Sequence, residues 1–193
     1  MITLGELRSK VDIERQALKD VLLIKPRIYY DDRGYFFESF KENFFDKIGL
    51  NLKFIQDNEV YSNDIGIIRG LHYQLKNPQG KLVHVVSGAI RDVIVDIRAN
   101  SPDFGESIII DIDSRSHNMI YIPEGFAHGY LVVEKNTIVQ YKCTNYYDPN
   151  SEFGILWNDK DLNIDWGFSN PVLSDKDSKL PKLKDQKNLP ESL

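Results

Sequence analysis

The chain has 193 residues, of which 41% are hydrophobic and 27% charged, a balance that fits one globular domain and excludes a globally disordered chain. Its formal net charge of -5 at pH 7 argues against general nucleic-acid binding, which needs a basic surface. No apolar run reaches the length of a membrane-spanning helix, and residues 1–20 lack the continuous apolar core of a signal peptide, so we expect a cytoplasmic protein without a membrane partner.

The N-terminal residues are the least informative part of the chain. Leu4, Leu7, Val11 and Leu18 recur at loosely helical intervals, which predicts an arm or a short helix over residues 1–20. From Val21 onward the composition favours strands instead. The main domain is therefore expected over residues 21–185, with a surface tail over residues 186–193.

The first part of the main domain mixes strand, turn and helix patterns. The segment VLLIKPRIYY is β-rich and interrupted by Pro26, the following DDRG is typical of a turn, and YFFESF predicts another strand. Residues 41–50 predict a short helix with Phe44, Phe45 and Ile48 on one side, ended by Gly49.

Strand patterns dominate the rest of the domain. Eight segments of about ten residues follow one another with short turns between them: KFIQDNEVYS, GIIRGLHYQ, KLVHVVSG, AIRDVIVDIR, ESIIIDID, NMIYIPEG, HGYLVVEK and TIVQYKCTNYY. Such spacing favours a two-sheet sandwich or barrel over alternating strands and helices. We therefore predict an all-β, cupin-type jelly roll, or double-stranded β-helix, with a few short peripheral helices.

The single cysteine excludes an intrachain disulfide. Cys143 ends a predicted strand, and its simplest role is that of a small buried hydrophobic residue. A lone reduced thiol also fits a reducing compartment.

The histidines raise the question of a metal site. Cupin-type rolls commonly hold a metal through two histidines two residues apart and a carboxylate, but here His72 is followed at that interval by Gln74, a weak neutral ligand. His128 lies in the well-formed segment PEGFAHG, whereas His84 and His117 have no ligand spacing and are read as structural or surface residues. The pattern favours a metal-free cavity in which His72 and His128 act as bases or hydrogen-bonding groups.

Several blocks resemble the dTDP-4-dehydrorhamnose 3,5-epimerase family, which are metal-free cupins. They occur in order and at the expected spacing from about residue 21 to about residue 183: DDRGYFFESF, FIQDNEVYSNDIGIIRGLHYQ, PQGKLVHVVSGAIRDVIVDIR, SPDFGE, IPEGFAHGY, YKCTNYYDP, WNDKDLNIDW and LSDKD. The combination of RGLHYQ, PQGKL and PEGFAHG is far more specific than any one of these motifs.

The resemblance implies a reaction on a dTDP-linked 4-keto-6-deoxyhexose, without a redox cofactor or a metal. Protons at C3 and C5 both flank the C4 ketone, so an epimerase needs a base on one face of the sugar, a donor to the enolate oxygen and an acid on the other face. By resemblance, His72 is the base and Asp177 its carboxylate partner. Tyr141 is the acid across the ring, although a core aromatic would explain it equally well, and Lys81 faces the enolate unless it only protects a sheet edge.

The resemblance also implies a nucleotide-sugar site and a homodimer. The expected contacts are Arg33, Glu38, Gln56, Asp57, Asn58, Arg69, His128, Tyr147, Glu152 and Lys176. Each has an ordinary surface explanation when taken alone. Family members are homodimers in which some contacts cross between subunits, which makes Arg33 and Glu38 expected contributors to the partner's site.

Some departures from the family pattern keep alternatives open. Glu59 and Tyr61 differ from the common residues after QDN, and GFSN follows IDW. An epimerase acting at C3 or C5 alone, or on another nucleotide-linked 4-keto sugar, remains an alternative. A metal-dependent cupin and a non-catalytic sugar-nucleotide-binding roll are further ones.

Overall fold

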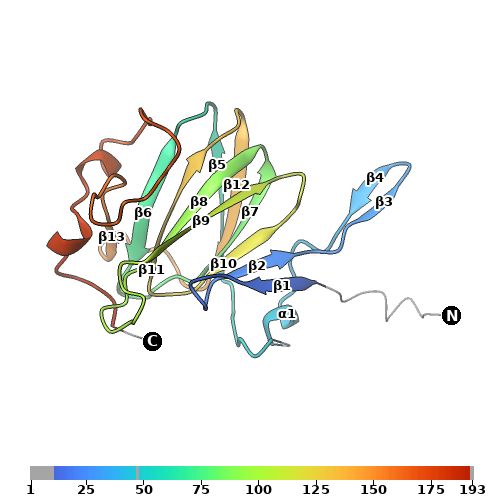
Figure 1. The fold of residues 1–193 in the computed structure, drawn as a ribbon. Helices are drawn as coiled ribbons and strands as arrows, with labels where there is room; N and C mark the ends of the chain where they lie inside the picture. The colour runs from blue at the N-terminus through green and yellow to red at the C-terminus, as the bar shows by residue number, and fades with distance from the viewer. Residues whose placement is uncertain (1–10, 47, 192–193) are drawn as a thin grey trace.

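The computed structural model describes residues 11–46 and 48–191 and consists mainly of two β-sheets packed face to face (Figure 1). This confirms the all-β expectation. The larger sheet contains, in spatial order, β1 (Asp12–Arg15), β2 (Leu22–Lys25), β10 (Met119–Ile122), β7 (Lys81–Ser87), β12 (Thr137–Cys143) and β5 (Gln56–Ser62). The smaller sheet contains β13 (Glu152–Gly154), β6 (Ile68–Gln74), β11 (Phe126–Val132), β8 (Ala89–Asp96) and β9 (Ser107–Asp113).

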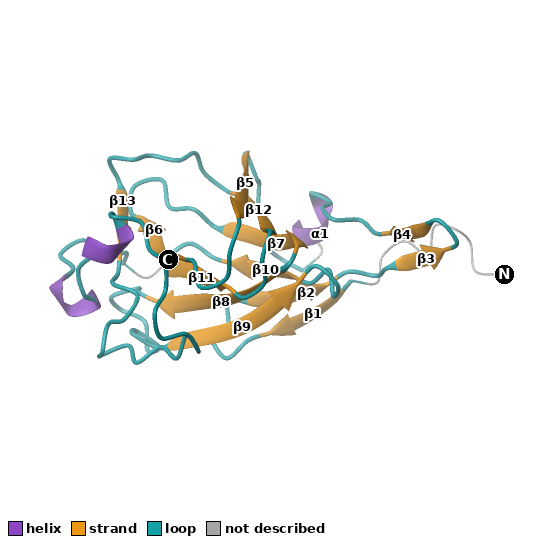
Figure 2. Cartoon of the chain, turned by 90° about the horizontal axis from the view of Figure 1, so that it is seen from above, coloured by secondary structure: helices purple, strands orange, loops and turns teal. Residues whose placement is uncertain are grey.

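A two-stranded hairpin leaves the body of the molecule. It consists of β3 (Tyr29–Asp31) and β4 (Gly34–Phe36), and both ribbon views show it projecting away from the two sheets (Figures 1 and 2). Its aromatic side chains Tyr30, Tyr35 and Phe36 are largely exposed. Exposed aromatic residues on a projecting hairpin are typical of a contact surface.

Side-chain alternation along the strands builds two apolar clusters on either side of the smaller sheet. On β8, Ile90 and Ile94 point between the two sheets, and Val93 and Val95 point to the outer face. The outer cluster is covered by the C-terminal part of the chain, including Leu183. Because β8 is covered on both faces, its sequence reads as nearly continuous apolar residues rather than as a clean alternation.

The N-terminal expectation needs a correction. Residues 12–15 form strand β1 in antiparallel register with β2, with Ile13 opposite Ile24, and not a helix. The strand pairs its backbone with an existing sheet edge, which outweighs a weak helical spacing of apolar residues. The first ten residues of the predicted arm lie outside the described residues.

The helix expected over residues 41–50 and the strand expected over residues 35–40 are both present but shorter than predicted. The expected helix is reduced to α1 (Asn43–Asp46), which packs Phe45 against the outer face of the larger sheet, and Gly49 follows in a left-handed turn at φ 81°. The strand expected over residues 35–40 ends at Phe36. Beyond this strand, Phe40 returns to the body and packs against Phe54.

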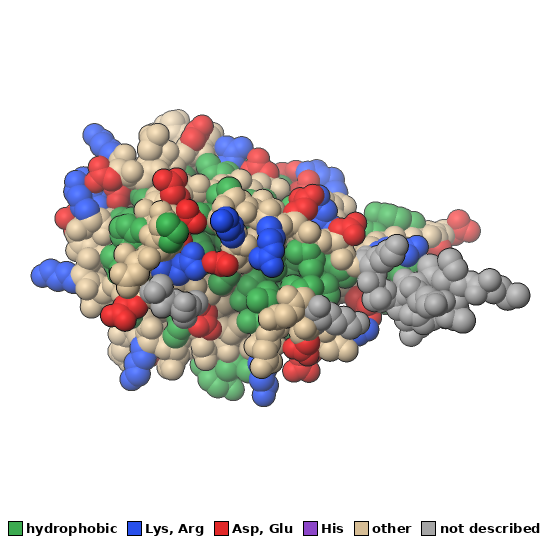
Figure 3. Space-filling view, turned by 60° about the horizontal axis from the view of Figure 1, so that its bottom comes forward, with side chains coloured by type: hydrophobic (Ala, Val, Ile, Leu, Met, Phe, Trp, Pro, Cys, Tyr) green, Lys and Arg blue, Asp and Glu red, His purple; other side chains and the backbone are tan. Residues whose placement is uncertain are grey.

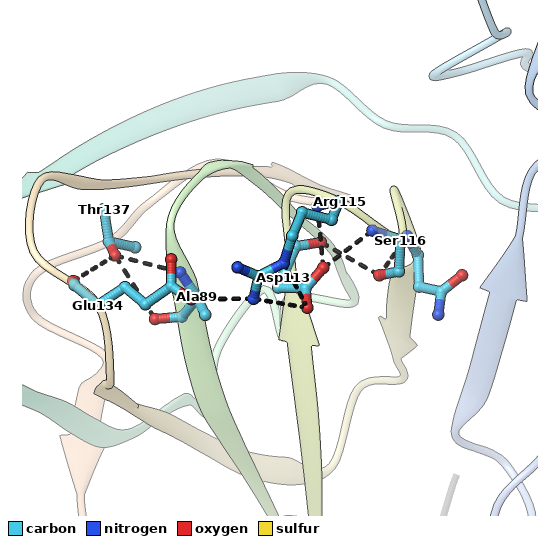
Figure 4. A network of polar contacts seen from close by, with 7 residues as sticks. Ala89, Asp113, Arg115, Ser116, Glu134 and Thr137 are labelled. Atoms are coloured by element: carbon cyan, nitrogen blue, oxygen red, sulfur yellow. Dashed lines mark hydrogen bonds and ion pairs between the residues drawn. The ribbon is translucent and has the colours of Figure 1, made fainter. Parts of the chain in front are cut away.

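Polar turns close one end of the sandwich (Figure 4). The Thr137 hydroxyl donates to the carbonyl of Glu134 at 2.7 Å and accepts from the amide of Ala89 at 3.3 Å. Arg115 bridges the carboxylates of Asp113 and Glu134 at 3.0 and 2.9 Å. These contacts tie the β8–β9 side of the smaller sheet to the β11–β12 turn.

The surface carries mixed charge. On the face seen in Figure 3, Lys and Arg side chains are interspersed with Asp and Glu side chains. None of the helices in the described ranges is long and apolar enough to cross a membrane.

A histidine pair, with His117 buried and His84 half-buried, lies where the base of the hairpin meets the body. Phe37 packs against both His84 and His117, with ring centroids 5.8 and 4.7 Å apart. His84 Nε2 is buried and has no hydrogen-bond partner among the described residues. Burial, together with the neighbouring His117, lowers the pKa of His84 below its ordinary value. Of the two roles expected for these histidines, structural or surface, the packing against Phe37 favours the structural one, with His117 buried and His84 half-buried.

This pair predicts a loss of stability in mild acid. Below the ordinary histidine pKa of about 6.5, the unfolded chain binds a proton that folded His84 resists, so the free energy of unfolding falls as the pH drops. We expect the melting temperature to decrease between about pH 7.5 and about pH 5.5, and a His84→Leu variant to show a shallower decrease. An equally steep decrease in that variant would assign the effect to other groups, such as buried His128.

Candidate active site

A cavity of about 500 Å³ opens between the two sheets at the end where β6 and β11 pair. His72 and His128 are directly opposite each other in this pair, so their side chains leave the strands on the same side. The polar lining includes Arg69, His72, Lys81, His128, Tyr130, Tyr141, Lys176 and Asp177. Strands from both sheets and the segment after Val172 therefore contribute to one site.

His72 is paired with a carboxylate. Its Nε2 lies 2.6 Å from Asp177 Oδ1, and the Asp177 side chain is 6% exposed. Burial favours the neutral acid, but the hydrogen bond and charge of His72 outweigh burial and lower the pKa of Asp177 overall. An ionised Asp177 fixes the imidazole ring and supports a positive charge on it.

A second histidine–carboxylate pair lies beside the first. His128 Nε2 is 3.0 Å from Asp92 Oδ2, and both side chains are almost completely buried. Burial lowers the pKa of His128, and the contact with Asp92 only partly offsets this effect. His128 is therefore mostly neutral near pH 7, which suits a hydrogen-bonding role better than a cationic one.

Lys81 is a central residue and not an edge residue. It begins β7, which lies between β10 and β12, so the edge-protection alternative is wrong. Burial lowers the pKa of its ammonium group. Nearby Glu152 and Asp92 favour the charged form. Lys81 thus places its amine in the cavity from the middle of the larger sheet.

Tyr141 also reaches the cavity, from β12 on the sheet opposite His72. Burial raises the pKa of its phenol, so the hydroxyl group stays protonated at neutral pH. The site therefore holds a protonated phenol and an imidazole on walls that face each other. Tyr141 thus lines the cavity and also packs against the core between the sheets.

The cavity adjoins a second region that shares part of its lining. His72, Lys81, Tyr141 and Lys176 line both regions, and the second adds Gln56, Asn58, Gln79, Tyr147 and Glu152. The Lys176 ammonium group pairs with Glu152, which also accepts a hydrogen bond from the Tyr147 hydroxyl at 2.8 Å. Although burial opposes ionisation, these two partners lower the pKa of Glu152 overall. Five of the ten residues expected to contact the nucleotide-sugar therefore line this second region.

Three expected residues lie elsewhere in this chain. Asp57 points to the outer face of β5 and pairs with Lys142 at 2.9 Å, because neighbouring strand residues face opposite sides. Arg33 is at the tip of the hairpin and pairs with Asp31, and Glu38 follows the hairpin and pairs with Lys41. The structure does not bring Asp57, Arg33 or Glu38 into the cavity.

Two polar groups of the cavity region were missed from the sequence. The Tyr130 hydroxyl and Asp92 Oδ1 are both buried, and neither has a hydrogen-bond partner in residues 11–46 and 48–191. Tyr130 is opposite Asp92 in the β11–β8 register. Tyr130 lies two residues after His128 on β11, so both side chains point to the inner face of the smaller sheet. This two-residue spacing was the signal in the sequence that could have identified Tyr130.

The donor set does not resemble a metal centre. Within the described part of the chain, no three or more His, Cys, Asp and Glu side chains are grouped to hold a metal ion. Gln74, at the interval where a second histidine ligand would be expected, donates to the carbonyls of Asn77 and Tyr146 and accepts from the amide of Asp148. It holds the loop after β12 in place.

Comparisons with known proteins agree on one family. Residues 15–185 match the family model described as dTDP-4-dehydrorhamnose 3,5-epimerase. The dTDP-4-dehydrorhamnose 3,5-epimerase of Shigella flexneri is 43% identical over 169 residues, covering 86% of this chain and 93% of that protein.

Solved structures give the same result. A dTDP-6-deoxy-D-glucose-3,5-epimerase from Legionella pneumophila, in complex with dTDP-4-keto-L-rhamnose, is 40% identical with a TM-score of 0.91, covering 95% of this chain and all of that one. A 3'-monoepimerase from Streptomyces bikiniensis, in complex with dTDP-quinovose, is 30% identical with a TM-score of 0.85, covering 91% of each chain.

Proposed function

The chain belongs to the dTDP-4-dehydrorhamnose 3,5-epimerase family, and we propose that it inverts C3 and C5 of dTDP-4-dehydro-6-deoxy-D-glucose to give dTDP-4-dehydro-L-rhamnose. It is an isomerase with a cupin-like jelly-roll fold. The observation that carries the proposal is the placement of the His72–Asp177 pair and the protonated Tyr141 on opposing walls of one cavity.

The proposed reaction moves protons only. His72 takes the proton from C3 or C5, and the electron pair of the broken C–H bond moves into an enolate whose charge rests on the C4 oxygen. Tyr141 then gives its proton to the same carbon from the opposite face, which restores the ketone with inverted configuration. Solvent returns a proton to Tyr141 and accepts the one held by His72, so no oxidant or reductant is consumed.

Asp177 fixes which nitrogen of His72 acts. Its carboxylate accepts the hydrogen bond of Nε2, so Nδ1 presents the lone pair to the sugar. The imidazolium formed after proton transfer then lies against an ionised carboxylate. Lys81 and neutral His128 serve the C4 oxygen and the sugar, and the second region of the cavity serves the nucleotide.

Lys81 should contribute strongly to turnover and little to folding. A Lys81→Met variant is expected to lose about 10²–10³ in kcat, the usual cost of removing one donor to a developing oxyanion. Its melting temperature should not fall, because methionine fills similar space without burying a charge. Steady-state kinetics and thermal unfolding measure the two effects.

A lysine of the neighbouring strand is the matched control. Lys142 is on β12 but faces outward to Asp57, so Lys142→Met should leave kcat unchanged. Equal losses of kcat in the two variants would contradict the role proposed for Lys81.

The hairpin points to a homodimer with shared sites. Its exposed aromatic residues and the exposed Arg33 guanidinium, distant from the cavity of their own chain, suit contact with a second copy. We propose that Arg33 and Glu38 complete the nucleotide region of the partner subunit, where Arg33 would bind phosphate oxygens as a planar two-pronged donor. Residues 21–185 would be the catalytic domain, extended by β1, and residues 186–193 the tail. The lone buried Cys143 is consistent with a cytoplasmic location.

Deuterium incorporation tests the function directly. The protein is incubated with dTDP-4-dehydro-6-deoxy-D-glucose in deuterated water, and NMR locates the label and the configuration of each carbon. Label and inversion at both C3 and C5 are expected. Label at one carbon would indicate a single-position epimerase, as the 3'-monoepimerase relative suggests, and label at neither would exclude this substrate. An active protein that is insensitive to chelators would also set aside the metal-dependent alternative.

A further inference from the structure

The carboxylate partner of His72 does not belong to either sheet. Asp177 begins the short helix η1 (Asp177–Lys179), within a segment that we call the C-terminal strap, residues 172–190. In both ribbon views this part of the chain runs beside β6 and β13 (Figures 1 and 2). The His72–Asp177 pair therefore joins a sheet residue to a segment that must be held in position separately.

The strap is fastened on both sides of Asp177. Upstream, the amide of Val172 donates to the carbonyl of Gly66 at 2.8 Å, and the amide of Ile68 donates to the carbonyl of Val172 at 3.0 Å. Between this clamp and Pro181, the Asp177 amide is bonded only within the strap, to the Ser174 hydroxyl at 3.0 Å. The Asp177 carboxylate also contacts the body directly, through His72 and the amide of Gly70 at 3.4 Å, and the neighbouring Lys176 pairs with Glu152. The two fastened ends of the strap bring the carboxylate to these partners.

Downstream, five hydrogen bonds attach the strap to the body. They comprise Leu156 N to Pro181 O at 2.8 Å, Leu183 N to Asp159 Oδ2 at 2.8 Å, Gln186 Nε2 to Gly154 O at 2.5 Å, Tyr73 Oη to Asn188 O at 2.6 Å and Ala99 N to Pro190 O at 2.9 Å. These bonds reach well past the last residue that lines the cavity. The expected surface tail, residues 186–193, is thus attached to the body as far as Pro190.

Side-chain packing supports the same attachment. Leu183 is 7% exposed and belongs to the outer apolar cluster, against which Leu189 also packs. Leu180 lies over Gly154, where a Cβ atom would come within 2.7 Å of Leu180 Cδ1. Gly154 is in turn the register partner of His72 on the neighbouring strand. The strap thus lies against β13, the neighbour of the strand β6 that carries the base.

Tyr73 is the anchor closest to the base in sequence. It follows His72 on β6 and points to the opposite, outer face, where its ring stacks on Phe153 at 5.8 Å. Burial raises the pKa of Tyr73 to about 12, so its hydroxyl remains a donor at neutral pH. One strand thereby holds the base on its inner face and the strap on its outer face.

We propose that the strap beyond Leu180 is a positioning element for catalysis, and that Tyr73 is a positioning residue that holds Asp177 in register with His72 by binding the strap at Asn188. The inference rests on the proposed function, since it assigns a task to residues outside the cavity. A carboxylate displaced by about 1 Å can cost roughly 10²-fold in rate, so fastening the strap has a measurable effect on turnover.

Two truncations and one substitution test the strap. Deletion of residues 187–193 removes the Asn188 and Pro190 anchors and should lower kcat at saturating substrate by at least about tenfold. Deletion of residues 191–193 keeps both anchors and is the matched control, with kcat unchanged. Tyr73→Phe removes one hydroxyl group and should lower kcat in the same direction by a smaller factor. It remains informative if the longer truncation does not fold.

An Asp177→Asn background separates positioning from general destabilisation. If the strap acts through Asp177, Tyr73→Phe and the longer truncation should cause no further loss of kcat in that background. Equal losses in both backgrounds would overturn the proposal, as would wild-type kcat in both Tyr73→Phe and the longer truncation.

A measurement independent of activity keeps this test apart from that of the function. Amide hydrogen exchange should be faster in peptides that contain residues 177–179 of Tyr73→Phe than in wild type. Unchanged exchange there would overturn the proposal even in an active enzyme. If wild-type protein introduced no deuterium into the sugar, the proposed function would be rejected. The amide hydrogen exchange of residues 177–179 would still show whether Tyr73 holds the strap.

Discussion

Replacing His72 by asparagine is expected to abolish both inversion and deuterium incorporation at C3 and at C5. Removal of a general base typically costs 10²–10⁴ in rate, and here no second imidazole replaces it, because His128 is held by Asp92. We therefore expect a loss of at least about 10³ in kcat for both carbons together. Affinity for dTDP should persist, since His72 is only one member of the second region of the cavity.

The control for this substitution is a histidine in the same protein with no proposed chemical role. His84→Leu alters the outer side of β7 near Phe37 and should incorporate label at the wild-type rate. If His72→Asn retained labelling at either carbon within about tenfold of wild type, the base for that carbon would have to be another residue, with Tyr141 the first to examine.

Local sequence patterns were more informative about the site residues on β6 than about the carboxylate partner of His72. A strict two-residue period would place Arg69 and His72 on opposite faces of β6, but a register shift between these two positions brings both side chains into the cavity. Asp177 is 105 residues away in the chain, so no local pattern could pair it with His72; only the resemblance supplied it.

The same alternation exposes what the motif-based selection got wrong. Asp57 was selected as part of the block QDN, yet a strand cannot direct three consecutive side chains into one cavity, and only Gln56 and Asn58 reach it. Asp92 was overlooked because it lies in an apolar run, although a buried carboxylate there needs a partner and has one in His128.

The predicted bounds of the N-terminal and C-terminal segments were least accurate, because tertiary contacts determine their structure. Strand β1 exists because β2 offers an unpaired backbone edge, which residues 12–15 do not reveal by themselves. The end of the strap was expected to be only a surface tail, because its charge and prolines are typical of surface segments. Its attachment depends on partners such as Tyr73 and Ala99, which are far away in sequence.

Tyr141→Phe should separate proton exchange from inversion. Without the phenolic proton, the enolate can be reprotonated only from the side of His72, so each carbon recovers its original configuration. His72 is 26% exposed and exchanges its proton with solvent, so deuterium should still enter at C3 and C5. We expect inversion to fall by about 10²–10⁴ while labelling with retained configuration stays within about tenfold of wild type, both followed by NMR.

This pattern distinguishes an acid from a packing residue. A phenylalanine fills the same volume, so loss of packing alone would lower labelling and inversion together, in parallel with the melting temperature. Tyr61→Phe on the neighbouring strand β5 removes a hydroxyl that bonds Asn136 at the surface and should change neither rate. If Tyr141→Phe inverted both carbons at the wild-type rate, the proton would have to come from another group on the larger sheet. The Tyr141 phenol, whose pKa is raised by burial, would then have a structural role only.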